Sequence, residues 1–309
     1  MESSIILKNI AKEFHNNDNK YKIHDKLNNY IFKLSTDRKF IINSLKDCIS
    51  RRNFFLNDAQ NLFFYLLIEG DVIVAINLFP PIKNKEINIT HDNIHHHGWR
   101  LLSTAVIIGE GYETINFKRK SHEIIQNNVV KLKIEDSFKH VSGEVKFIDS
   151  EQAHVVFQPQ STSATLAVWS SDRSLRNQKL KKLFSNFPYV NKFISNTIHK
   201  LNLNNFFGLN KKKGVYFHPE NGKIVVTRNY SKPIDGERKE ITHCMFKFFQ
   251  DIEFKDMDFF HSLKNSIPIE SHEVCEKLIS NEKIEDLGII GDPRRRFTKK
   301  QILKAIDDK

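Results

Sequence analysis

The sequence lacks the marks of several large protein classes. Its 309 residues contain no run of about 18 apolar residues that could span a membrane. The start, MESSIILKNIAKEF, has neither the basic first segment nor the small-residue cleavage site of a signal peptide. The three cysteines, at positions 48, 244 and 275, show no CxxC spacing, so neither a disulfide framework nor a cysteine zinc site is indicated. We therefore expect a cytoplasmic protein that does not contact a membrane.

Motifs for nucleotide binding and hydrolysis are also absent. Only 11 glycines occur, and none forms a Walker loop, a GxGxxG motif or a GxSxG elbow. Gly109 and Gly111 fall in a predicted β-turn. A cysteine nucleophile is disfavoured as well, because His243 directly precedes Cys244 and adjacent side chains on a helix do not face each other.

Positive charge is concentrated in the C-terminal part of the chain. The formal net charge is +11, and residues 173–309 hold 27 Lys and Arg against 17 Asp and Glu. Such a surplus attracts anions, including nucleic acid. However, the basic segment PRRRFTKKQILKAI follows an acidic stretch, and the sequence shows no helix-turn-helix or aromatic-interleaved basic strip. We therefore favour a solvated basic face over a nucleic-acid partner.

Apolar spacing divides the first 172 residues into two parts. Residues 1–65 show helical periodicity and are predicted to form a helical N-terminal extension. Candidate N-caps for one of these helices are Ser35, Thr36 and Asp37. The run NLFFYLLIEG fits either a helix end or a buried strand. Residues 66–172 hold seven or eight short β-like runs, a pattern typical of a sandwich or small barrel.

Residues 173–309 are predicted to be a basic, mostly helical region. Near 214–230 the sequence GVYFHPENGKIVVTRNY indicates a β-hairpin, because Asn221-Gly222 tolerates the positive φ angles of a type I′ turn. The segment ERKEITHCMFKFFQDI has the spacing of an amphipathic helix. Thr298 is a plausible N-cap for a last helix.

Four histidines occur within the heptapeptide HDNIHHH, residues 91–97. Side chains alternate along a strand, so His95 and His97 would project from one face and His96 from the other. Two imidazoles on one face make half of a metal site, since first-row metals in enzymes commonly have three protein ligands. The best third ligand is His154, in an apolar strand where an unpaired imidazole would be costly.

Other ligand sets remain open at this stage. His91 or His96 could replace His95, and Asp92 could then orient a ligand. His140 and His122 are weaker candidates, because they lie in a predicted loop and a polar stretch.

The order of these residues resembles the two motifs of the cupin superfamily over about residues 65–172. In the general cupin pattern, HxH is followed by a glutamate and then by a glycine, and a second motif holds one histidine with an asparagine four residues later. Here Gly109 follows His97 by twelve residues, and Gln158 follows His154 by four. The glutamate position is occupied by Leu101 or Leu102.

A cupin without that glutamate resembles the three-histidine branch, to which thiol dioxygenases of the cysteine dioxygenase type belong. Together with the strand pattern, this predicts an α+β protein: a cupin-like double-stranded β-barrel (jelly roll) with helical N-terminal and mixed α/β C-terminal additions. The resemblance implies an Fe(II)-dependent dioxygenase acting on a small metal-chelating substrate with O2. Its implied metal ligands are His95, His97 and His154, and manganese, nickel or zinc could use the same three side chains.

Further residues are expected to lie in or near the predicted barrel. Tyr112 follows the glycine pair and is the candidate catalytic residue, since its phenol could point into the barrel; packing in the core is the alternative. Trp169 is predicted to line the barrel interior. Arg100 lies three residues after His97 and is predicted to face away from the site. Arg228 and Tyr230 could cover the barrel mouth or form an exposed hairpin face.

Two other functions compete with the enzyme hypothesis. One is a ligand-sensing cupin or regulatory binding module with a basic C-terminal region and no catalysis. The other is a structural or partner-binding protein without metal. The sequence leaves the substrate, the metal and the oligomeric state open.

Overall fold

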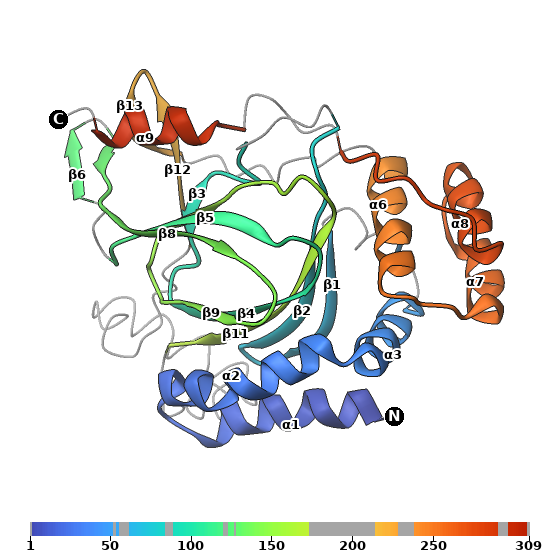
Figure 1. Cartoon of the computed structure of the whole chain (residues 1–309). Coiled ribbons are helices and arrows are strands. Elements are labelled where there is room, and N and C mark those ends of the chain that lie inside the picture. The colour runs from blue at the N-terminus through green and yellow to red at the C-terminus, as the bar shows by residue number, and fades with distance from the viewer. Residues whose placement is uncertain are drawn as a thin grey trace, which may run out of the picture.

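The structure is a computed structural model in which three helices precede a curled β unit and further helices follow it (Figure 1). It describes residues 2–51, 54–55, 62–83, 89–119, 123–126, 128–172, 214–227, 238–289 and 296–307. Within these ranges no helix combines the length and the apolarity needed to cross a membrane.

Two antiparallel sheets form the walls of the barrel. The first has the strand order β1 (Phe63–Glu69), β2 (Val72–Phe79), β11 (Ser163–Ser171), β4 (Arg100–Ile108) and β9 (Val145–Ile148). The second has the order β6 (Glu123–Gln126), β7 (Val129–Lys131), β13 (Lys223–Thr227), β12 (Val215–Glu220), β3 (Ile94–His96), β10 (His154–Val156), β5 (Tyr112–Phe117) and β8 (Ile134–His140). In both sheets, early strands pair with late ones, as in β2 with β11 and β3 with β10. This is a double-stranded β-helix, and the predicted cupin-like α+β fold is confirmed.

Burial along the strands shows which walls are covered on both sides. Every residue of β11 is buried, and so are seven of the nine residues of β4. The edge strand β8 instead exposes four of its seven residues, three of them charged. The sequence SATLAVWSS of β11 has small and apolar residues on both faces, because one face lies toward the barrel and the other toward the helices.

The N-terminal helices cover the outer face of the first sheet (Figure 1). They are α1 (Glu2–Asn16), α2 (Lys20–Thr36) and α3 (Arg38–Ile49). Among the candidate caps, Asp37 is the one used: it ends α2, and its side chain accepts a hydrogen bond from Phe40 N at 3.0 Å. The ambiguous apolar run NLFFYLLIEG contains strand β1.

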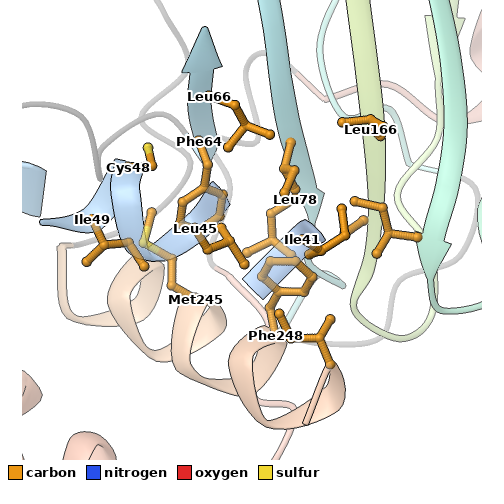
Figure 2. Close-up of a cluster of buried hydrophobic side chains, with 14 of the residues drawn as sticks. Ile41, Leu45, Cys48, Ile49, Phe64, Leu66, Leu78, Leu166, Met245 and Phe248 are labelled. Carbon is orange, nitrogen blue, oxygen red and sulfur yellow. The ribbon is translucent and has the colours of Figure 1, made fainter. Parts of the chain in front are cut away.

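A single hydrophobic cluster joins both ends of the chain to the outside of the first sheet (Figure 2). Ile41 and Leu45 of α3 and Phe64 of β1 pack with Met245 and Phe248 of the amphipathic helix α6 (Arg238–Asp251). Helices α7 (Met257–Leu263) and α8 (His272–Ile279) extend this cluster. The boundaries proposed at residues 65 and 172 stay predictions.

The predicted hairpin is present, with Asn221 and Gly222 at φ angles of 49° and 75°. Its strand β12 does not stand free: it pairs with β3, with Tyr216 opposite His95, and so extends the second sheet. The terminal helix α9 (Lys299–Asp307) packs against β12 and β13, and Thr298 caps it by accepting a hydrogen bond from Gln301 N at 3.2 Å. The expectations for Arg228 and Tyr230 lie outside the described residues.

A buried polar contact attaches α2 to the barrel. His24 is 1% exposed, and its two ring nitrogens lie 2.8 Å from Ser103 Oγ on β4 and 2.9 Å from Ser170 Oγ on β11. Burial, with a smaller contribution from the Lys20 charge, lowers the pKa of His24 to about 3. The ring of His24 is therefore neutral, and its two hydrogen bonds connect helix α2 to strands β4 and β11.

We predict that this contact makes stability depend on pH. The unfolded chain binds a proton on His24 below about pH 6.5, whereas the folded protein does so only near pH 3, so stability is lost as the pH falls. Between pH 7 and pH 5, the free energy of unfolding should fall by about 2 kcal/mol more in the wild type than in His24→Gln. Urea titrations at both pH values measure this difference.

The matched control is His261→Gln, which removes an exposed histidine on α7 and should follow the wild type. Equal pH dependence in the wild type and His24→Gln would show that His24 is not held neutral by the fold.

Candidate metal centre

Three histidines converge between the two sheets. His95 lies on β3, His97 follows directly after that strand, and His154 lies opposite His95 on β10. One nitrogen from each ring lies within 4.8 Å of the others. Among the described residues, these are the histidine, cysteine and acidic side chains that could together hold a metal ion. The pair that strand alternation grouped, His95 and His97, therefore lies next to the later His154, as the sequence indicated.

Backbone carbonyls orient two of the rings. His95 Nδ1 lies 2.9 Å from Asn93 O, and His154 Nδ1 lies 3.4 Å from Gln152 O. A carbonyl only accepts hydrogen bonds, so each Nδ1 carries the proton and each Nε2 presents a lone pair. In this tautomer, Nε2 is the nitrogen that can bind a metal.

The separation between the nitrogens of His95 and His97 agrees with a first-row metal ion. His95 Nε2 and His97 Nε2 are 3.2 Å apart. Two nitrogens about 2.1 Å from a metal, at angles between octahedral and tetrahedral, lie about 3.0–3.4 Å apart. The donor set of three imidazoles therefore fits a divalent metal such as iron, manganese, nickel or zinc.

Two of the rings, those of His97 and His154, are held in the neutral, metal-binding form. Burial lowers the pKa of His97 and of His154 well below the usual value, and the neighbouring imidazoles lower it further. His97 Nδ1 has no hydrogen-bond partner among the described residues, so packing orients this ring, with centroids 5.0 Å from His95 and 4.9 Å from His154.

The alternative ligands do not join this group. His96 points the other way, and its Nδ1 accepts a hydrogen bond from Gly98 N at 3.0 Å. The ring of His91 lies beside Phe79, and its Nδ1 is 2.9 Å from the Gln158 amide. His140 pairs with Tyr112, and His122 is outside the described residues.

The histidines open into a cavity of about 280 Å³ between the sheets. Its walls are largely apolar and include Phe63, Ile73, Leu102, Ile148 and Trp169. Trp169 thus lines the interior, as the sequence indicated. Leu102 occupies the wall at one of the two positions aligned with the cupin glutamate, so the site gains no carboxylate ligand there.

Arg100 was predicted to face away from the histidines, toward solvent or an interface. It is exposed, as expected, but it also borders the same cavity. Strand alternation fails between His97 and Arg100 because Gly98, at a φ of 66°, and Trp99 form a turn there. Arg100 and Asp92 are the charged side chains of the cavity wall.

Tyr112, the candidate catalytic residue, lies in the wall of this cavity. Its hydroxyl is 3.1 Å from His140 Nδ1, and its ring packs 4.7 Å from that of Phe79. Burial raises the pKa of Tyr112 to about 12, so the phenol keeps its proton at neutral pH. The pKa of His140 is lowered to about 4, mainly by burial, so its ring is neutral.

No sequence pattern singled out Tyr216. This residue comes from the hairpin, lines the cavity and stacks on His95 with centroids 5.5 Å apart. Its place depends on the pairing of β12 with β3, which joins segments more than 100 residues apart.

Comparisons with solved structures find cupin and double-stranded β-helix proteins. A cupin protein from Bacteroides fragilis matches over 33% of this chain and 68% of its own, with 12% identity and a TM-score of 0.23. A protein with a double-stranded β-helix domain from Klebsiella pneumoniae matches over 36% and 76%, with 13% identity and a TM-score of 0.23. The capsular polysaccharide assembling protein CapF from Staphylococcus aureus matches over 35% and 26%, with 19% identity and a TM-score of 0.24. No protein-family model matches the sequence, and no curated protein matches it either. These similarities are too distant to indicate an activity, and the fold assignment rests on the strand order.

We predict that His154→Ala abolishes metal binding. The wild type, loaded with Fe(II) or Zn(II) and desalted, should retain close to one metal per chain, and the variant close to none, because two imidazoles leave the site incomplete. Elemental analysis measures the content.

The matched control is His96→Gln, which changes the adjacent histidine on the opposite strand face and keeps an acceptor for Gly98 N. It should bind metal like the wild type. Full metal content in His154→Ala, or loss of metal only in His96→Gln, would refute the assignment of His95, His97 and His154.

Proposed function

We propose that the protein is a mononuclear non-haem Fe(II)-dependent dioxygenase that acts with O2 on a small metal-chelating substrate. The observation that carries this proposal is a group of three imidazoles, without a carboxylate among the described ligand candidates, at one side of a largely apolar cavity. A bound divalent iron would supply a redox-active Lewis acid with positions open on the cavity side.

The cavity restricts what can bind. About 280 Å³ is at the small end of ligand pockets, so it fits a molecule of amino-acid size rather than a polymer. Aromatic and aliphatic side chains from both sheets make up most of the wall. Arg100 and Asp92 provide one charge of each sign at the wall, which would orient a polar substrate against the histidines.

Tyr112 is proposed to hold a proton for the reaction. Its phenol is protonated at neutral pH, and its neighbour His140 is neutral and within hydrogen-bond distance. A neutral phenol at a cavity wall can donate a hydrogen bond to an anionic group of the substrate or to one that becomes anionic.

The activity is tested by oxygen consumption of the Fe(II)-loaded protein with a panel of small thiols and amino-acid derivatives. The proposal predicts substrate-dependent uptake of O2 that is lost in His154→Ala and in the zinc-loaded protein. Metal and ligand binding without O2 uptake would favour the ligand-sensing alternative. Absence of both would favour a structural or partner-binding protein.

With any substrate found in that panel, Tyr112→Phe should lower kcat by about a hundredfold and leave the metal content unchanged, because the phenol is lost while the three imidazoles stay. Tyr30→Phe is the matched control, since Tyr30 is exposed on α2, outside the barrel. A kcat unchanged in Tyr112→Phe would remove the catalytic role of Tyr112.

A further inference from the structure

His91 lies in the cavity wall but belongs neither to the metal ligands nor to the Tyr112 pair. Three segments that are distant in sequence surround it, at residues 79–80, 156–158 and 296. His91 N donates to Val156 O at 2.7 Å, and Gln158 N donates to Ile89 O at 2.7 Å, so the His91 and Gln158 side chains are brought together by paired backbone. The ring edge of Phe79 packs on His91 with centroids 5.0 Å apart.

The surroundings of Gln158 determine the orientation of its amide. Pro80 O lies 2.7 Å from one end of the amide, and Arg296 Nη1 lies 3.0 Å from the other. Only the amide nitrogen can donate to a carbonyl, and only the amide oxygen can accept from a guanidinium. The opposite orientation would place two acceptors against each other and two donors against each other.

This orientation fixes the proton on His91. The same Gln158 oxygen that accepts from Arg296 lies 2.9 Å from His91 Nδ1. An oxygen acceptor requires Nδ1 to be the protonated nitrogen, so Nε2 carries the lone pair of a neutral ring. Because Nδ1 bonds to Gln158, Nε2 is the ring nitrogen with which His91, a residue of the cavity wall, can accept a hydrogen bond.

Arg296 is positioned by the C-terminal segment. Its guanidinium also donates to Thr90 O at 3.1 Å, while Thr90 N donates to Phe297 O at 2.9 Å and Phe297 N donates to Thr90 Oγ1 at 3.0 Å. These bonds attach residues 296–298 beside residues 89–90, directly before His91. The C-terminal segment therefore acts, through Gln158, on a cavity whose own lining residues all lie between positions 63 and 216.

We propose that Arg296 and Gln158 are positioning residues that hold His91 as its Nδ1-protonated tautomer, so that Nε2 accepts a hydrogen bond from the substrate. The ligand class this selects is a small molecule that carries an O–H or N–H donor in addition to its metal-binding group. The assignment of a metal-binding group rests on the proposed function, whereas the tautomer of His91 does not.

The tautomer is read from long-range ¹H–¹⁵N spectra of the full-length protein labelled with ¹⁵N-histidine, where protonated and unprotonated ring nitrogens differ in chemical shift. His91→Gln identifies the signals. The wild type should show protonated Nδ1 and unprotonated Nε2, both metal-free and loaded with zinc. Protonated Nε2 in the wild type would overturn the proposal.

Variants test whether Gln158 and Arg296 determine the tautomer of His91. Gln158→Leu and Arg296→Met should each increase the population with protonated Nε2, because each removes part of the acceptor arrangement at Nδ1. Lys299→Met is the matched control: it removes a cation of the same segment, whose partner is Glu113 at 2.9 Å, and should leave the tautomer unchanged. An unchanged tautomer in both Gln158→Leu and Arg296→Met would overturn the roles of Gln158 and Arg296.

The ligand class is tested on the zinc-loaded protein with two thiols that differ in one hydroxyl, 2-mercaptoethanol and ethanethiol. The His91 Nε2 signal should move with 2-mercaptoethanol and not with ethanethiol. 2-Mercaptoethanol should bind about fivefold more tightly, the equivalent of one net hydrogen bond, and His91→Phe should remove this difference. Equal responses to the two thiols would refute the donor-bearing ligand class. If zinc does not bind, the proposed function fails. The tautomer of His91 in the metal-free protein still tests the positioning roles of Gln158 and Arg296.

Discussion

The pairing of the short strands β3 and β10 is the constraint on which the site depends. Their register places His154 opposite His95, and β12 and β5 continue the sheet on either side. A shift of one residue in this pairing would turn the histidines of one strand away from those of the other. The flanking strands fix the register, since β5 aligns β10 and β12 aligns β3.

The helices outside the barrel make the interior cavity possible. Strands β4 and β11 are buried on both faces, and an uncovered outer face would leave their apolar side chains in water. Helix α2 covers this face and is bonded to both strands through His24. Helices α3 and α6 share one cluster beside β1 and β2, so residues from both ends of the chain stabilise the same wall. The barrel interior therefore does not have to supply the whole core, and part of it remains open as the cavity.

Local sequence patterns predicted much of this fold. The features that they missed depend mainly on pairing between segments distant in sequence. Period-two alternation grouped His95 with His97, and helix chemistry offered Asp37 as one of three candidate caps. The same alternation failed for Arg100, because a turn interrupts the strand after His97. Tyr216 and the contact between Gln158 and Arg296 could not be predicted, since both require segments that meet only when the sheets close. Metal identity and substrate are not encoded in any local pattern, because the same three imidazoles bind several divalent ions.

The proposed site consists of three imidazoles that bind one metal ion without a carboxylate or thiolate of the protein. X-ray absorption spectroscopy of the iron-loaded protein distinguishes these ligands, because imidazole rings give multiple-scattering features that carboxylates and thiolates do not. We expect about three imidazole ligands at about 2.1 Å, with the remaining light-atom ligands from solvent. Fewer than three imidazoles, or a sulfur ligand from the protein, would refute this ligand set.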